Sequence, residues 1–166
     1  MSITNLISII AAGLLLAQLV VIYIAYKADN ERKKKQSTIE YINQIRSFYK
    51  PIRNKLDRLF PDKDRVINLE DIDDNLKGDI KELLSIIEHL SVGLNTNVYD
   101  FDIFFRMSGS YFLRIFYKLQ PYISDVQRRQ NTAYIEYEAI CERIKKAKEK
   151  HNYKISITKS RKMKFS

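Results

Sequence analysis

Polar side chains form a stripe along residues 101–119, and their types suit the binding of an anion. On a helical wheel the stripe follows the rim of an apolar face and consists of Arg106, Ser110, Arg114 and Lys118. Arg46 and Arg53 lie seven residues apart in an earlier amphipathic segment. Because a guanidinium group presents paired N–H donors that match two phosphate oxygens, these six residues are the predicted ligand-binding set. The alternative is a solvated or salt-bridged helix face.

The sequence lacks the residue patterns that catalysis usually requires. Ser108 and Ser110 stand in MSGS, whereas a serine nucleophile needs the G-x-S-x-G turn. The two histidines, His89 and His151, are too far apart to form a metal-ligand pair on one helix, and the four glycines form no phosphate-binding loop. The single cysteine, Cys141, rules out an internal disulfide and a multi-cysteine zinc site. We therefore expect a protein that is not an enzyme and that needs neither a metal ion nor a cofactor.

The formal net charge of +9 is unevenly distributed along the 166 residues. Residues 27–35 carry five Lys/Arg and two acids, residues 36–142 carry 14 and 17, and residues 143–166 carry ten and one. The central part is therefore slightly acidic, and the positive charge lies at its two ends. Such basic ends attract anionic lipid, or any other polyanion, without sequence preference.

An uncharged segment long enough to cross a bilayer occupies the N-terminal part of the chain. The 21 residues from Leu6 to Tyr26 contain no charged side chain, and as a helix they span about 31 Å, close to the thickness of a bilayer's hydrocarbon core. A buried helix of a soluble domain would rarely be apolar over this whole length. A cleaved signal peptide would need basic residues before the apolar run, and here they follow it. The sequence therefore predicts a transmembrane anchor.

The flanking charges predict the orientation of this anchor. Five Lys/Arg residues follow it within nine positions, and only the α-amine precedes it. The positive-inside rule then places the N-terminus outside and the rest of the chain in the cytoplasm, at the inner (cell) membrane of a bacterium. Within the span, Gly13 and Ala17 form a small-xxx-small pair and Gln18 puts an amide near mid-membrane. Both features favour association of spans, so we expect a homo-oligomer, with a tetramer as one option.

The hydrophobic periodicity predicts an all-α protein, in which one transmembrane helix is followed by a cytoplasmic bundle of about four helices. We divide the chain into an anchor (1–27), a basic juxtamembrane linker (28–36), a helical domain (37–151) and a basic tail (152–166). Whether the anchor helix runs on into the first cytoplasmic helix is left open by the sequence.

Local signals mark the expected helix ends within the domain. The residues STIE at 37–40 read as a capping box that begins a helix of about 24 residues, and Pro51 should kink or divide this helix. Residues 61–75 read as a loop. A second helix follows and ends near Gly93, and its apolar stripe consists of Ile80, Leu83, Leu84, Ile87 and Leu90. Asp100 should cap a third helix that continues or restarts beyond Pro121. A last helix should then open at residue 131 or 132. Its spacing predicts six inward residues: Tyr134, Tyr137, Ile140, Cys141, Ile144 and Ala147.

Three segments of the chain carry a family resemblance. They are STIEYIN (37–43), EHLSVGLNTNVYD (88–100) and FRMSGSYFLRIFYKLQP (105–121), the last with Arg106, Gly109, Arg114 and Pro121. From about residue 38 to 145 the chain resembles a family of small bacterial proteins known only as a domain of unknown function, in which an N-terminal anchor precedes a helical domain. The family usually has glycine where Asn97 stands, and asparagine tolerates the same left-handed backbone. The resemblance implies an architecture and no established activity.

Anchor, helical domain and basic charge together suggest a functional hypothesis. We expect a membrane-anchored sensor or effector whose cytoplasmic domain oligomerises and binds an anionic ligand, a cyclic oligonucleotide being one class. In layout, though not in motif, the chain resembles the membrane effectors of CRISPR antiviral defence that cyclic oligoadenylates gate. The alternative is a membrane-tethered scaffold that binds a protein partner and no small molecule. The sequence alone does not separate the two.

Overall fold

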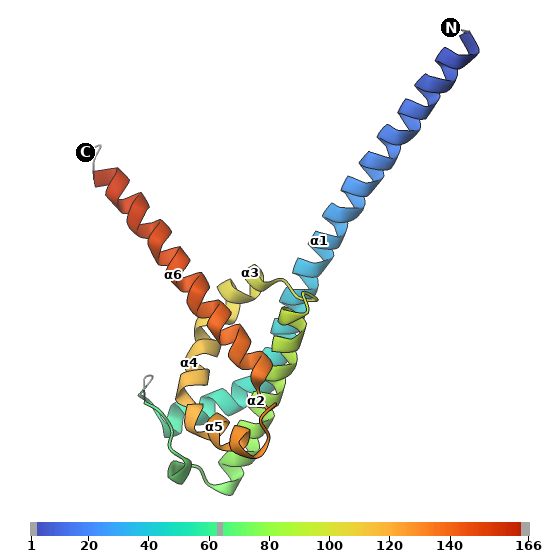
Figure 1. Ribbon diagram of the computed structural model, residues 1–166. Coiled ribbons are helices and arrows are strands. Elements are labelled where there is room, and N and C mark those ends of the chain that lie inside the picture. The colour runs from blue at the N-terminus through green and yellow to red at the C-terminus, as the bar shows by residue number, and fades with distance from the viewer. Residues whose placement is uncertain (1–2, 63–64, 164–166) are drawn as a thin grey trace.

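The computed structural model describes residues 3–62 and 65–163, and every regular element within these ranges is helical. Most of these helices pack against one another in a bundle (Figure 1). Two helices project from the same end of this bundle, α1 with the N-terminus and α6 with the C-terminus. The predicted all-α class is thus confirmed for the described residues.

The first helix, α1 (Ile3–Leu59), joins the apolar segment to the bundle without a break. The juxtamembrane residues 28–36 are therefore helical. Ion pairs within the helix support this charged stretch, because Asp29 accepts from Arg32 at 3.1 Å and from Lys33 at 2.7 Å. Pro51 lies inside α1 and does not divide it. Figure 1 shows the last turns of α1, in teal, bending away from the line of the earlier ones.

The capping box predicted at residues 37–40 is wrong, because these residues lie in the interior of α1. Thr38 is fully buried, and its hydroxyl donates to the carbonyl oxygen of Lys34 at 2.7 Å. The same hydroxyl accepts the backbone N–H of Asp100 at 2.8 Å. The threonine therefore joins two distant segments, which no local pattern reveals.

The second helix, α2 (Asp74–Asn95), packs against α1 and α6 and follows a short 3₁₀ turn, η1 (Leu69–Asp71). Its N-terminus is capped by Asp73, whose carboxylate accepts the N–H of Leu76 at 2.7 Å. The predicted inward residues are all fully buried: Ile80, Leu83, Leu84, Ile87 and Leu90. Beyond the helix, Asn97 has φ of 64°, the left-handed conformation expected for this position.

Asp100 caps the next helix, α3 (Phe101–Phe104), as predicted, since its carboxylate accepts the N–H of Ile103 at 2.9 Å. The chain continues through the π-helical turn η2 (Phe105–Gly109) into α4 (Ser110–Lys118). After Leu119 it restarts as α5 (Gln120–Arg129), with a proline in the first turn. The helical periodicity of the sequence did not predict the π-helical turn.

The last helix, α6 (Ile135–Met163), begins after a turn in which Tyr134 has φ of 61°. The predicted start at residue 131 or 132 is therefore too early. Four of its six predicted inward residues, Tyr137, Ile140, Cys141 and Ile144, are fully buried. Ala147 is only half-buried, and Tyr134 is half-buried in the turn before the helix. The helix runs through most of the predicted basic tail, of which residues 164–166 lie outside the described range.

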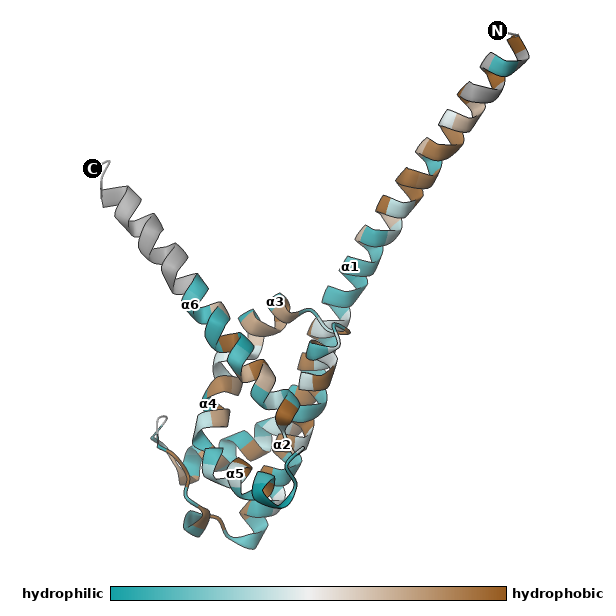
Figure 2. Cartoon of the chain, in the orientation of Figure 1, coloured by the Kyte–Doolittle hydropathy of each residue, from teal (hydrophilic) through white to brown (hydrophobic). Residues whose placement is uncertain are grey.

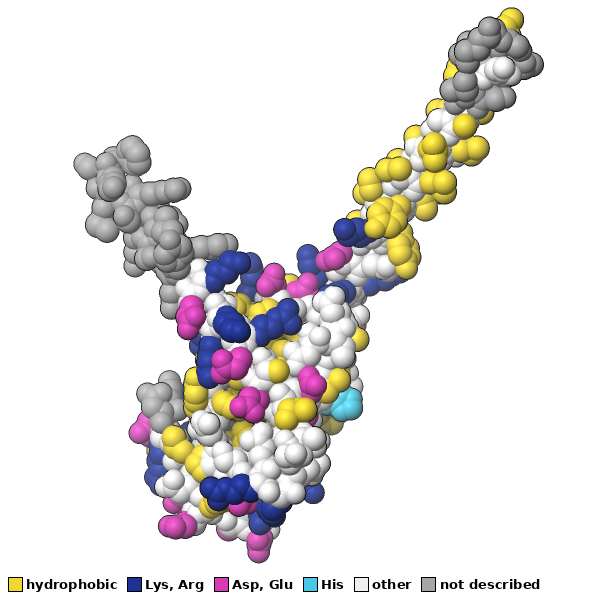
Figure 3. Space-filling view, viewed as in Figure 1, with side chains coloured by type: hydrophobic (Ala, Val, Ile, Leu, Met, Phe, Trp, Pro, Cys, Tyr) yellow, Lys and Arg dark blue, Asp and Glu magenta, His cyan; other side chains and the backbone are white. Residues whose placement is uncertain are grey.

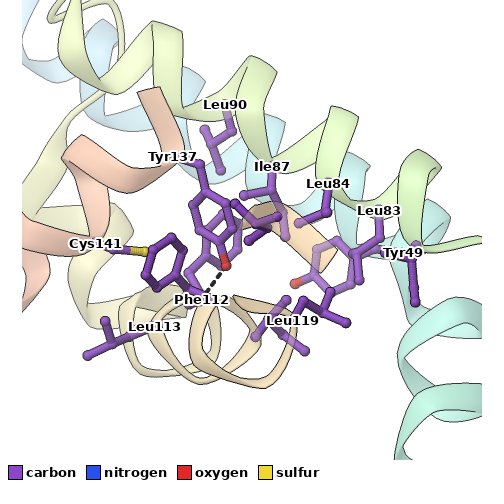
Figure 4. Packing of buried hydrophobic residues seen from close by; sticks show 14 of the residues in the cluster. Tyr49, Leu83, Leu84, Ile87, Leu90, Phe112, Leu113, Leu119, Tyr137 and Cys141 are labelled. Carbon is purple, nitrogen blue, oxygen red and sulfur yellow. Dashed lines mark hydrogen bonds between the residues drawn. The ribbon is translucent and has the colours of Figure 1, made fainter. Parts of the chain in front are cut away.

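Tyr137 lies in the middle of the core and ties α6 to α4 (Figure 4). Its hydroxyl donates to the carbonyl oxygen of Phe112 at 2.5 Å, and its ring meets Phe112 and Phe116 edge-on. The start of α6 is fastened to α2, because the Glu88 carboxylate accepts the backbone N–H of Tyr137 at 2.8 Å and that of Glu136 at 3.2 Å. Helices α2, α4 and α6 are thus held to one another, and polar residues on α4 have fixed positions.

Candidate anion-binding site

Two of the predicted ligand-binding residues, Arg53 on α1 and Arg114 on α4, meet at the ring of Tyr111. The guanidinium carbon of Arg53 lies 4.9 Å from the ring centroid, and that of Arg114 lies 5.6 Å from it. The same ring stacks on Tyr49 of α1, with centroids 5.5 Å apart. Because the face of an aromatic ring attracts cations, Tyr111 can hold two like charges near each other. We call Arg53 and Arg114 the arginine pair.

One carboxylate contacts the arginine pair within the described residues. Asp57 Oδ2 lies 3.4 Å from Arg53 Nε, and both side chains are 44% exposed. An ion pair this open to solvent is weak and is screened by salt. Asp57 thus offsets one of the two guanidinium charges of the arginine pair. An anion with several oxygens could therefore accept N–H donors from two helices at once.

The structure places Lys118 away from solvent, where its ammonium group already has partners. The side chain is buried, and Nζ donates to the carbonyl oxygens of Phe60 at 2.7 Å and Asp62 at 3.1 Å. Burial lowers the pKa of this amine. The carbonyl of Lys118 in turn accepts the N–H of Ile67 at 2.9 Å. Lys118 thus fastens the chain that follows α1 onto the end of α4.

The remaining predicted residues, Arg46, Arg106 and Ser110, have exposed side chains. Within the described part of the chain none of the three side chains makes a hydrogen bond or an ion pair. Arg46 stands about two turns before Arg53 on α1, and Arg106 belongs to the π-helical turn η2. Turns of this kind are frequent at functional sites. The structure therefore brings together two of the six predicted residues and leaves three others free on the surface.

Two buried hydroxyl groups in the same region have no hydrogen-bond partner among the described residues. They belong to Ser108 in η2 and to Tyr111 in α4. Burial raises the pKa of Tyr111, which keeps its hydroxyl protonated. Tyr111 was not among the residues predicted from the sequence, although its spacing of three residues from Arg114 puts both on one helix face.

Metal-ligating side chains and the single thiol are the other groups with potential chemistry among the described residues. No group of three or more potential metal-ligating side chains occurs within them. Cys141 is buried, and burial raises the pKa of its thiol to about 12, so the thiol stays protonated near neutral pH.

The predicted anchor segment is exposed wherever its side chains are described. One helix within the described ranges is long and apolar enough to cross a membrane, and none of its apolar window is buried. Figure 2 shows this hydrophobic stretch in brown, and Figure 3 shows Lys and Arg side chains appearing where the apolar surface of α1 ends. Gly13, Ala17 and Gln18 are all exposed, and a Cβ at Gly13 would meet no atom within 4 Å.

A family described as "Domain of unknown function (DUF4760)" matches residues 6–144 of the chain. The chain belongs to this family. No curated protein and no solved structure matches it. The DUF4760 match begins in the apolar segment and ends within α6, so it includes both the apolar helix and the bundle. Most of the basic C-terminal segment lies outside it.

The turn at 95–100, between α2 and α3, contacts α1 where α1 leaves the bundle. Lys34 Nζ donates to Asn97 Oδ1 at 2.5 Å. The ring of Tyr41 stacks on that of Tyr99, with centroids 4.8 Å apart and planes at 15°. Together with the Thr38 contact described above, these interactions dock the turn at 95–100 onto α1.

The third segment, 105–121, contains a glycine at a close approach of helices. A Cβ on Gly109 would lie 3.0 Å from Cδ2 of Phe105 and 3.8 Å from Cγ2 of Ile144 on α6. A larger residue would therefore press on the Phe105 ring. Packing thus explains why glycine suits position 109. In the same segment, Arg106 is exposed and Arg114 is half-buried.

Proposed function

We propose that this DUF4760 protein is a single-pass membrane sensor or effector whose cytoplasmic bundle binds an anionic ligand at the arginine pair. In this proposal the N-terminus faces out and the bundle lies in the cytoplasm of a bacterium. The five Lys/Arg residues at positions 27–35 support this orientation.

The observation that carries the proposal is the continuity of α1. One helix holds the exposed apolar segment, contributes Arg53 to the arginine pair, and buries Ile42, Ile45 and Leu56 in the core. A ligand that bridges Arg53 and Arg114 would act directly on the packing of α1 against α4. Because the helix is unbroken, a shift in that packing would also move its membrane end.

Self-association would convert such a shift into an effect on the membrane. Gly13, Ala17 and Gln18 are exposed on α1 and available to a second copy. We therefore propose a homo-oligomer, for which a tetramer is one arrangement. Cyclic oligonucleotides are a suitable ligand class because they carry several phosphates. The similarity to the CRISPR membrane effectors concerns layout alone.

A second function, a membrane-tethered scaffold for a protein partner, is favoured by two exposed aromatic side chains. Phe48 on α1 is 58% exposed, and Tyr117 on α4 is 43% exposed. Exposed aromatic residues are typical anchors of protein interfaces. A scaffold of this kind would need no small-molecule ligand.

Isothermal calorimetry on the full-length protein in detergent micelles tests the ligand proposal. The titrants are pyrophosphate and a panel of linear and cyclic nucleotides, each at two salt concentrations. Arg53→Gln combined with Arg114→Gln should lower the affinity about 100-fold or more, because each charged contact contributes about 1.5–3 kcal/mol.

A matched control removes the same charge elsewhere. Lys81→Gln with Arg128→Gln alters two exposed residues that make no ion pair within the described chain, and it should change the affinity less than about threefold. An equal loss in both double variants would show that overall charge, and not the arginine pair, binds the ligand. If no titrant binds more tightly than about 1 mM, or about 4 kcal/mol, the ligand proposal fails and the scaffold replaces it.

A further inference from the structure

A groove lies between α1 and the turn at 95–100, at the end of the bundle nearest to the apolar segment. Figure 1 shows α2 running toward that end, so that the turn after it reaches α1 there. The groove is a cavity of about 280 Å³. Its lining is Tyr23, Tyr26, Lys27, Asn30, Glu31, Lys34 and Asn97. We call it the interfacial groove.

The charges around the interfacial groove favour an anion. Lys27 and Lys34 line it two helical turns apart, and within the described residues neither ammonium group is paired with a carboxylate. Lys34 instead donates to the neutral amide oxygen of Asn97 at 2.5 Å. Asp29, the nearby acid that does form ion pairs, is held by Lys33 and Arg32, which also lower its pKa. Glu31 is the one carboxylate in the lining.

The apolar side of the interfacial groove is continuous with the exposed apolar surface of α1. Tyr23 and Tyr26 are each 65% exposed and end the apolar segment. Tyrosines at this position suit the boundary between hydrocarbon and headgroups. Across the groove, the tip of the turn carries Val98, which is 60% exposed. Beside a membrane-spanning segment, an exposed apolar side chain such as Val98 would lie among lipid headgroups.

We propose that the interfacial groove binds the headgroup of an anionic phospholipid from the leaflet that faces the bundle. The ammonium groups of Lys27 and Lys34 bind the phosphate, and the side-chain amide of Asn97, which accepts from Lys34, lies beside it. The acyl chains lie along the apolar surface of α1 beside Tyr23. The inference rests on the proposed membrane insertion of α1. It assigns to the turn at 95–100 a second contact with the membrane, which would fix the bundle's orientation to the bilayer.

The absence of tryptophan from the sequence allows a test by single-tryptophan fluorescence. Full-length Val98→Trp, Val92→Trp and Leu16→Trp are reconstituted in bilayers of equal phosphatidylglycerol and phosphatidylcholine. In each sample one of the two lipids is brominated. The extent to which that lipid quenches the tryptophan fluorescence reports how often it contacts the tryptophan. Val92 is the matched control, because it is also an exposed valine, 43% accessible, but lies on α2 before the turn.

The three variants should differ in how the brominated lipids quench them. Fluorescence of Leu16→Trp is quenched equally by both lipids, that of Val98→Trp is quenched at least about twofold more by the anionic lipid, and that of Val92→Trp is quenched by neither. Adding Lys27→Gln and Lys34→Gln to Val98→Trp should remove the anionic preference. Adding Lys50→Gln and Lys81→Gln, which alter exposed lysines outside the groove, should leave it in place.

The outcomes separate the two proposals. If Leu16→Trp is not quenched, the proposed membrane insertion of α1 fails. If Leu16→Trp is quenched but Val98→Trp is not, or if Val98→Trp shows no anionic preference, the insertion stands and the lipid site is overturned. A preference that survives loss of Lys27 and Lys34 would likewise overturn the groove as its cause.

Discussion

Replacing Gly93 with alanine should destabilise the bundle by pressing the turn at 95–100 away from α1. A Cβ at Gly93 would lie 2.4 Å from Cδ2 and 2.5 Å from Cε2 of Tyr99, far inside contact distance. The Tyr99 ring is stacked on Tyr41 and cannot shift without loss of that contact. Overpacking of this kind costs about 1–3 kcal/mol. Because Gly93 lies in a helix, the better helix propensity of alanine stabilises the variant by about 1 kcal/mol. The expected net loss in the free energy of unfolding is therefore roughly 0–2 kcal/mol.

Gly78→Ala makes the same chemical change in the same helix without the clash. A Cβ at Gly78 would meet no atom within 4 Å, so this variant should gain up to about 1 kcal/mol. The difference between the two variants, about 1–3 kcal/mol, isolates the contact with Tyr99. Urea denaturation of the full-length protein in micelles, followed by circular dichroism, measures both stabilities.

Two results would refute this reasoning about Gly93. One is that Gly93→Ala and Gly78→Ala are equally stable. The other is that the penalty of Gly93→Ala persists in a Tyr99→Ala background, where the clashing ring is gone.

Three further predictions concern other contacts. Lys118→Met leaves the carbonyl of Phe60 without its donor, and in urea denaturation it should cost about 1–3 kcal/mol. Burial raises the pKa of Glu88, so the folded protein binds this proton more readily than the unfolded chain, and stability should fall as pH rises through that pKa. The melting temperature of Glu88→Gln should decrease less over this pH range than that of the unchanged protein, because glutamine does not titrate. Glutamine also keeps an acceptor for the backbone N–H of Tyr137. Deleting residues 152–166 should weaken low-salt binding of labelled RNA, measured by fluorescence anisotropy, and leave selective nucleotide binding unchanged.

Local signals in the sequence predicted much of the fold. The length of the apolar segment, the N-cap at Asp100 and the left-handed backbone at Asn97 depend on a few neighbouring residues, and the structure agrees with each. The inward faces of α2 and α6 followed from their spacing of three and four residues. These features need no knowledge of the rest of the chain.

The errors arose where a distant segment decides the local structure. Thr38 has the sequence context of a capping residue, but the preceding charged residues continue the helix and its hydroxyl serves Asp100, 62 positions away. Lys118 reads as an exposed member of a polar stripe, whereas carbonyl groups of the loop after α1 enclose its ammonium group. The meeting of Arg53 and Arg114 depends on Tyr111 between two helices, which no spacing within one helix reveals.

The proposed function depends on the orientation of α1 in a membrane, and reporter fusions at Ser166 in a bacterial host measure that orientation. The five Lys/Arg residues at positions 27–35 predict that the C-terminus stays in the cytoplasm. A fluorescent protein that matures only inside the cell should therefore be active and membrane-bound, and a phosphatase that folds only in the periplasm should be inactive. An active phosphatase fusion, or a fluorescent fusion found in the soluble fraction, would contradict the proposed placement of the chain.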